Sequence, residues 1–124
     1  MIVDDEHSIL MTTQRALERE GYEVVTARDG EECLKKLENY TPDLILLDIM
    51  MPGLTPKEII QEIRKRGLKL KILYFSAIKE KDDTGKRLRK GFVANSDRDY
   101  VVGYLEKPFT LEILKKKVSD ALAK

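Results

Sequence analysis

Residues 44–53 read LILLDIMMPG, so a run of apolar residues ends at Asp48 and a Pro-Gly pair follows shortly after it. A short apolar run bounded by turn residues is typical of a strand that is buried on both faces of a parallel sheet. Open α/β folds bind their ligands at the carboxyl ends of such strands. We therefore expect Asp48 to lie at the functional edge of an α/β domain.

Three other strand-like segments carry polar side chains at their carboxyl ends. The chain places Asp4 and Asp5 after residues 2–3, Ser76 at the end of residues 70–76, and Lys107 after residues 101–106. Because the carboxyl ends of parallel strands meet at one edge of a sheet, we expect these side chains to lie near Asp48. The sequence therefore predicts one polar site built from four strands.

Strand patterns and helix patterns alternate along the whole chain. Strands are expected at residues 1–3, 22–27, 43–48, 70–76 and 101–106. Helices are expected to begin at the capping residues Ser8, Asp29, Thr55 and Thr110. This alternation implies parallel βαβ units, whose right-handed crossovers place helices on both faces of the sheet. We predict an α/β fold with a doubly wound, five-stranded parallel sheet.

Composition narrows the classes of function. The chain has 124 residues, of which 42% are hydrophobic, and we expect one domain over residues 1–124. The formal net charge of +1 argues against bulk nucleic-acid binding. No membrane span or signal peptide is visible, so we expect a cytoplasmic protein. The single cysteine, Cys33, excludes an internal disulfide and a cysteine-rich zinc site, and it is expected to be a core residue.

The predicted cluster suits a divalent metal and a phosphoryl group. Carboxylates that crowd at one site repel one another, so their ionised forms need a cationic partner. Mg²⁺ fits because it takes one or two carboxylates, keeps several waters and shares phosphate oxygens. Lys107 would add a compact positive charge and Ser76 a hydroxyl donor, while Asp48 could act as a nucleophile.

Four fragments at these strand ends resemble one known family. They are Ile2-Val3-Asp4-Asp5-Glu6, Leu46-Leu47-Asp48-Ile49-Met50-Met51-Pro52, Phe75-Ser76-Ala77 and Lys107-Pro108-Phe109. In this order they resemble the receiver domain (CheY-like) of two-component response regulators, and the resemblance covers nearly the whole chain. It implies a flavodoxin-like sheet with the strand order 2-1-3-4-5.

The resemblance also implies a phosphoryl-accepting site. Asp48 would be the phosphoacceptor for a histidine kinase. Asp5 and Asp48 would bind Mg²⁺ directly, Asp4 would act through water, and the Met50 backbone carbonyl would complete the protein ligands. Lys107 would hold the phosphoryl group.

Two further residues take switch roles by the same resemblance. Ser76 would be the hydroxyl that moves toward the phosphoryl group. Tyr104 would be the aromatic residue that turns inward in response, although a half-buried packing tyrosine remains an open alternative. The movement would remodel the face formed by the fourth helix, the fifth strand and the fifth helix, and partners would bind that face.

Two features depart from the family pattern. Thr55-Pro56 stands where Asp-Gly is frequent in the family, but threonine also caps a helix. The span between Ser76 and Lys107 is several residues longer than expected. We therefore expect residues 79–99 to contain a fourth helix or flanking loop that is extended or rebuilt. The helical stripe of this segment is weak and consists of Leu88, Phe92 and Val93.

We predict a phosphorylation-dependent signalling switch that is not an ordinary enzyme, with chemistry limited to its own phosphorylation and autodephosphorylation. Its expected partners are a histidine kinase and a downstream protein effector, without nucleic acid or membrane, and the expected state is a monomer or weak dimer.

Three alternatives remain open. They are a phosphorylation-independent binding module that uses residues 79–99, a phosphomonoester hydrolase, and a receiver cut from a longer protein.

Overall fold

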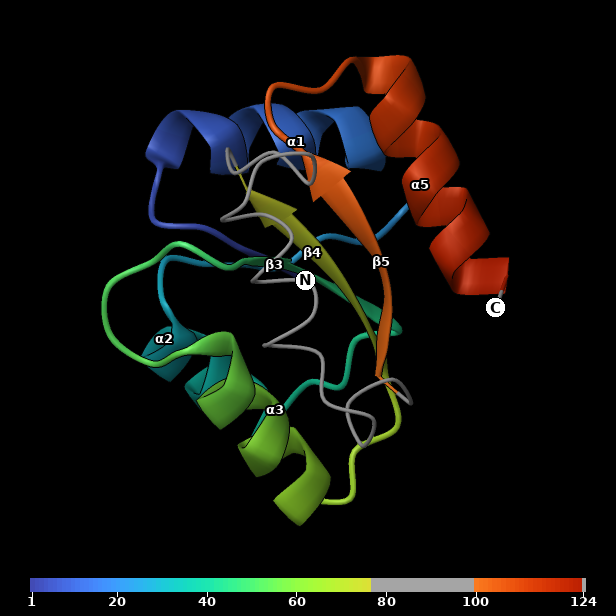
Figure 1. The fold of residues 1–124 in the computed structure, drawn as a ribbon. Coiled ribbons are helices and arrows are strands. Elements are labelled where there is room, and N and C mark those ends of the chain that lie inside the picture. Colours follow the sequence, from blue (N-terminus) through green and yellow to red (C-terminus); the bar gives the residue numbers. More distant parts are fainter. Residues whose placement is uncertain (77–99, 124) are drawn as a thin grey trace.

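The computed structural model describes residues 1–76 and 100–123, with Ser76 described for its backbone alone (Figure 1). One parallel sheet has the strand order β2-β1-β3-β4-β5. Its members are β1 (Ile2–Val3), β2 (Thr26–Ala27), β3 (Leu44–Asp48), β4 (Lys71–Ser76) and β5 (Val101–Glu106). The predicted fold class and strand order are confirmed.

Helices cover both faces of this sheet. The described helices are α1 (His7–Arg19), α2 (Gly30–Lys36), α3 (Pro56–Lys65) and α5 (Leu111–Ala123). In Figure 1, α1 and α5 lie above the sheet, while α2 and α3 lie below it. The expected fourth helix, with its stripe of Leu88, Phe92 and Val93, falls outside the described residues. The sheet therefore lies between two pairs of described helices.

Each face of the sheet has its own hydrophobic core, because successive strand residues point to opposite faces. On the α1/α5 face, the core includes Leu46 of β3, Phe75 of β4 and Leu114 of α5. On the α2/α3 face, it includes Ile45 of β3 and Ile60 of α3. All five residues of β3 are buried, as expected of a central strand that contributes to both cores.

Three of the four predicted helix starts are confirmed. Thr55 accepts a hydrogen bond from the Glu58 backbone N–H at 3.2 Å, and the Glu58 carboxylate accepts one from the Thr55 N–H at 3.1 Å. This reciprocal pair is a capping box, which fixes the start of α3. Asp29 caps α2 by accepting the Glu32 N–H, and Thr110 caps α5 by accepting the Ile113 N–H.

The predicted cap at Ser8 was wrong, because α1 begins two residues earlier than a cap at Ser8 implies. Glu6 occupies the N-cap position with an extended backbone, and Ser8 is already helical. The physical reason lies in Asp4, whose Oδ1 accepts the Glu6 N–H at 3.0 Å. That short-range bond closes the turn after β1, so the helix starts at His7.

The second strand is shorter than the predicted residues 22–27. Only Thr26 and Ala27 pair with β1, opposite Ile2 and Val3. A strand needs a neighbour to complete its hydrogen bonds, and β1 offers two residues as partners. Sequence composition predicted the strand, whereas the length of its neighbour set the extent of regular pairing.

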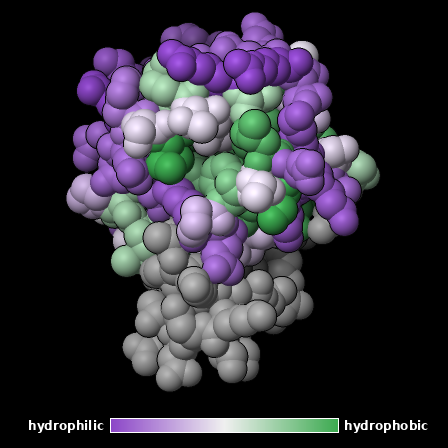
Figure 2. Space-filling model, turned by 90° about the horizontal axis from the view of Figure 1, so that it is seen from above, coloured by the Kyte–Doolittle hydropathy of each residue, from purple (hydrophilic) through white to green (hydrophobic). Residues whose placement is uncertain are grey.

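Figure 2 views the molecule from the side of α1 and α5, where hydrophobic surface is enclosed by hydrophilic side chains. Two exposed large hydrophobic residues of the described chain, Leu111 and Ile113, belong to α5. Among the described residues, no helix is both long enough and apolar enough to cross a membrane.

Candidate functional site

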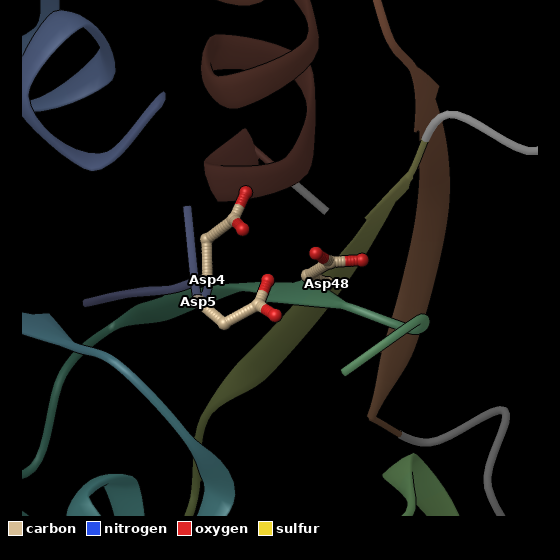
Figure 3. A group of neighbouring side chains, drawn as sticks. All are labelled: Asp4, Asp5 and Asp48. Atoms are coloured by element: carbon tan, nitrogen blue, oxygen red, sulfur yellow. The ribbon is translucent and has the colours of Figure 1, made fainter. Parts of the chain in front are cut away.

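Three carboxylates gather at the carboxyl ends of β1 and β3 (Figure 3). Asp4, Asp5 and Asp48 each offer one oxygen atom, and these atoms all lie within 4.8 Å of one another. Asp4 is 0% exposed and Asp48 is 5% exposed, whereas Asp5 lies at the surface. The predicted gathering of the three aspartates is therefore present in the structure.

Strand register explains why these residues meet. Val3 of β1 pairs with Leu47 of β3, so the residues that follow, Asp4 and Asp48, lie side by side. At the other side of β3, Asp48 pairs with Phe75 of β4. The carboxylate of Asp48 is thus central in the sheet and is flanked by the ends of two neighbouring strands.

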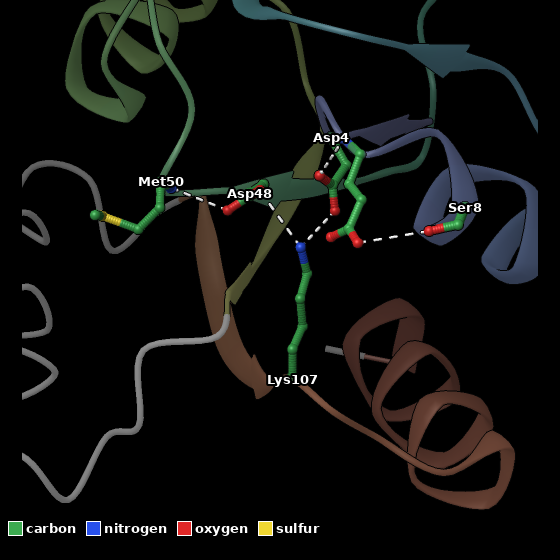
Figure 4. A network of polar contacts seen from close by, with 6 residues as sticks. Asp4, Ser8, Asp48, Met50 and Lys107 are labelled. Atoms are coloured by element: carbon green, nitrogen blue, oxygen red, sulfur yellow. Dashed lines mark hydrogen bonds and ion pairs between the residues drawn. The ribbon is translucent and has the colours of Figure 1, made fainter.

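The loop after β3 fixes one oxygen of Asp48. The Met50 backbone N–H donates a hydrogen bond to Asp48 Oδ1 at 2.9 Å (Figure 4). Met50 is 57% exposed, and its side chain points away from Asp48 in Figure 4. A donor that is held by its own loop orients the carboxylate without using a side chain.

Lys107 reaches the same carboxylates from the end of β5 (Figure 4). Its Nζ lies 2.5 Å from Asp4 Oδ2 and 3.3 Å from Asp48 Oδ2. The Lys107 side chain is 11% exposed, so these ion pairs are shielded from water. Asp4 therefore contacts the lysine directly, and the sequence pattern did not predict this contact. The peptide bond between Lys107 and Pro108 is cis.

Burial raises the pKa of Asp48 to about 6. The hydrogen bond from Met50 and the positive charge of Lys107 both lower this pKa, but the nearby Asp4 raises it further. Burial outweighs the stabilising partners because a carboxylate that has left water loses its hydration. The positive charge of Lys107 therefore lowers the pKa of Asp48 without offsetting the effect of burial.

The donor set fits a hard divalent cation. Within the described part of the chain, three carboxylates face one ammonium, so these four groups, when fully ionised, carry a net charge of −2. Carboxylate oxygens that meet at a partly open site are ligands of the type that Mg²⁺ and Ca²⁺ prefer. Asp5 is exposed to solvent, which leaves room for the water molecules that Mg²⁺ retains.

The two predicted switch residues occupy the neighbouring strands. The Ser76 backbone ends β4 and pairs with Glu106 of β5, while its side chain falls outside the described part of the structure. Tyr104 lies on β5, is half-buried and packs against the core on the α2/α3 face. The structure therefore puts both residues on strands next to the site, and their switch roles stay predictions.

A second contact at the site was also not predicted from the sequence. The Lys107 Nζ lies over the ring of Phe75, 4.6 Å from its centroid. In the sequence, Phe75 stands out only as the first residue of the fragment Phe75-Ser76-Ala77. Its neighbour relation to Lys107 depends on the pairing of β4 with β5, which no local pattern specifies.

Comparison with known protein families matches most of this chain to one family. Residues 1–119 match the family model described as the response regulator receiver domain. The alkaline phosphatase synthesis transcriptional regulatory protein PhoP of Bacillus subtilis is 39% identical over 122 residues, which are 98% of this chain and 47% of PhoP. Response regulator MprA of Mycobacterium sp. (strain KMS) is 35% identical over 98% of this chain and 49% of MprA. The chain thus spans about half the length of these curated relatives.

Solved structures agree with the sequence relatives. A CheY-like response regulator receiver domain protein from Methanospirillum hungatei JF-1 has a TM-score of 0.79 and 28% identity, and the match covers 99% of this chain and 92% of that chain. Response regulator protein TrrA from Thermotoga maritima has a TM-score of 0.76 and 36% identity, with 97% and 95% covered. The TrrA structure is described as a complex with Mg(2+)-BeF.

Proposed function

The chain belongs to the response regulator receiver domain family, and from this premise we propose that it accepts a phosphoryl group on Asp48 from a histidine kinase. One observation carries the proposal. Asp48 ends a fully buried strand, its Oδ1 accepts the Met50 N–H at 2.9 Å, and its Oδ2 lies 3.3 Å from the Lys107 ammonium. The nucleophile is oriented from one side and placed beside positive charge on the other, as phosphoryl transfer requires.

The proposed transfer is a displacement at phosphorus. An oxygen of Asp48 attacks, the new bond to phosphorus forms, and the bond between phosphorus and the leaving atom of the donor breaks. Lys107 would hold an oxygen of the transferred group, since its ammonium already lies between Asp4 and Asp48. Asp48 would later release the group to water, so the expected chemistry is self-phosphorylation and autodephosphorylation, not turnover of a separate substrate.

Mg²⁺ is the proposed cofactor. Asp5 and Asp48 would bind it directly, Asp4 would act through water, and the Met50 backbone carbonyl would complete the protein ligands. The excess negative charge of the cluster and the Mg(2+)-BeF complex of the relative TrrA support this assignment. Bound Mg²⁺ would neutralise charge on the transferred phosphoryl oxygens.

The proposed output is a change in a protein-binding face. Ser76 would contact the phosphoryl group as the switch hydroxyl, and Tyr104 would respond on β5. The face would include β5 and α5 together with the segment that follows β4. A downstream protein effector would bind this face. The chain itself would contact neither nucleic acid nor membrane. It would act in the cytoplasm as a monomer or weak dimer. The relative PhoP is named as a transcriptional regulatory protein, which is compatible with an effector that acts on transcription.

Acetyl phosphate labelling followed by intact-protein mass spectrometry tests the proposal. Wild-type protein should gain one phosphoryl group in the presence of Mg²⁺ and none after chelation. Asp48→Asn should gain none, whereas Asp43→Asn is the matched control, because Asp43 is an exposed aspartate directly before β3. Absence of labelling in the wild type under every condition would contradict the proposal and would favour a phosphorylation-independent binding module.

A further inference from the structure

Among the described residues, three groups lie beside the Lys107 ammonium. Two are carboxylate oxygens, Asp4 Oδ2 at 2.5 Å and Asp48 Oδ2 at 3.3 Å. The third is the aromatic ring of Phe75, whose centroid lies 4.6 Å from Nζ. An ammonium group carries three N–H donors, and the face of an aromatic ring attracts a cation within about 6 Å. The ring is therefore a partner of the lysine in its own right.

Burial makes this contact strong. Phe75 is 0% exposed and the Lys107 side chain is 11% exposed, so little water screens the attraction between the charge and the ring. Cation–π contacts that are shielded from water are worth more than those at the surface. The Phe75 ring carries no net charge, so it does not replace an anionic phosphoryl group as a partner of Lys107.

The position of the Phe75 ring is fixed by its surroundings. Phe109 packs edge-on against it, with ring centroids 6.4 Å apart and an interplanar angle of 61°. The Phe75 side chain lies in the core between the sheet and the α1/α5 layer. Its backbone pairs with Asp48 on one side and Leu105 on the other. The ring is thus a rigid platform that belongs to the strand between β3 and β5.

We propose that Phe75 is a positioning residue that holds the Lys107 ammonium beside Asp48 while the anionic partners of the lysine change. The inference rests on the proposed phosphorylation of Asp48. When a phosphoryl group joins Asp48, Lys107 must exchange one carboxylate contact for a phosphoryl oxygen. The attraction of the ring persists through this exchange, because the ring neither gains nor loses charge.

A double-mutant cycle in the labelling rate tests the proposal. Phe75→Leu retains an apolar core residue but removes the aromatic face, and it should slow Mg²⁺-dependent labelling by acetyl phosphate by about 3- to 30-fold. In a Lys107→Met background the same substitution should change the rate little, because no cation remains above the ring. Leu73→Val is the control on the same strand and in the same core, and its effect should be equal in both backgrounds.

A second cycle does not depend on phosphorylation. The unfolding equilibria of wild type, Phe75→Leu, Lys107→Met and the double variant, measured in urea with Mg²⁺ present, should reveal a coupling of about 3- to 30-fold between the two residues. If the wild type is never labelled but this coupling is found, the proposed function fails while the contact is confirmed. Equal effects of Phe75→Leu in both backgrounds, in rate and in unfolding, would overturn the positioning role.

Fluorinated phenylalanines at position 75 sharpen the test, because they keep nearly the same shape while weakening the negative face of the ring. The labelling rate should fall stepwise from phenylalanine to monofluoro-, difluoro- and trifluorophenylalanine. This series also serves if the Lys107→Met protein does not fold. A rate that is unchanged across the series would contradict the proposal, since a purely structural role depends on shape and not on ring charge.

Discussion

The strands β3 and β5 both end at the candidate site, yet they differ in burial. All five residues of β3 are buried, whereas in β5 Leu105 is buried and the other five residues are only partly so. The proposed phosphoacceptor ends β3, while Tyr104 lies on β5 and Lys107 follows it. A strand packed on both faces suits a group that must stay in place. A partly buried strand at the edge of the sheet suits groups whose contacts are expected to change.

Substitutions on β3 and β5 should differ most clearly in whether the protein still accepts a phosphoryl group. Asp48→Asn, at the end of β3, should abolish labelling by acetyl phosphate, because an amide is not the anionic nucleophile that the transfer needs. Tyr104→Leu, on β5, should retain labelling but alter the amide chemical-shift changes that accompany it. Mass spectrometry and amide NMR spectra of the two variants check this prediction. Equal loss of labelling in both variants would remove the distinction between acceptance and readout.

Stability should show the same contrast between the strands. Ile45→Ala removes a fully buried side chain of β3 and should lower the free energy of unfolding by about 2–5 kcal/mol. Val101→Ala truncates a half-buried side chain of β5 and should cost about 1 kcal/mol. Urea denaturation of both variants measures the difference. Equal costs would show that β5 is packed as firmly as β3.

Substitution of the exposed residue Asp5 should weaken Mg²⁺ binding but leave the free energy of unfolding nearly unchanged. Asp5→Asn should weaken Mg²⁺ binding at least about tenfold, because it removes a charged ligand from the proposed site. Its free energy of unfolding without metal should change little, since Asp5 lies at the surface. Isothermal titration calorimetry gives the affinity, with Asp120→Asn, an exposed aspartate of α5, as the control. Unchanged affinity in Asp5→Asn would place the ion elsewhere.

The buried acceptor should cost the metal-free protein some stability. The pKa of Asp48 is raised to about 6, so the folded protein binds this proton more tightly than the unfolded chain does. The contribution of Asp48 to stability therefore falls as the pH rises from about 4 to about 6. Asp48→Asn removes this loss, and without metal at pH 7 it should be more stable than the wild type by about 1–3 kcal/mol.

The stability difference between Asp48→Asn and the wild type should shrink toward pH 4, where the wild-type carboxyl is protonated, and it should also shrink when Mg²⁺ is added to the wild type. Urea denaturation from pH 4 to pH 7 checks the trend. A difference that does not depend on pH would mean that burial of the charge is not its cause.

Much of the fold followed from local patterns. The apolar run before Asp48, the capping residues Asp29, Thr55 and Thr110, and the alternation of strands and helices all lie within short windows of sequence. Burial of a strand and capping of a helix can be predicted from residues within such short windows. The strand order followed from the family resemblance, and the structure confirmed it.

The departures arose where a distant partner decides the outcome. The start of α1 depends on the Asp4 carboxylate, and the extent of β2 depends on the length of β1. The ion pair between Lys107 and Asp4 and the contact between Lys107 and Phe75 join residues that are far apart in the chain. Residues 79–99, which were expected to contain an extended or rebuilt helix, lie outside the described residues, so that expectation remains a prediction.

Chemical location of the phosphoryl group tests the central claim most directly. Protein labelled with acetyl phosphate and Mg²⁺ is treated with borohydride, which reduces an acyl phosphate of aspartate to homoserine, and the peptides are sequenced by tandem mass spectrometry. Homoserine at position 48, absent after chelation of Mg²⁺, is the result that the account predicts. Homoserine at Asp4 or Asp5, or labelled protein that yields none, would contradict Asp48 as the acceptor.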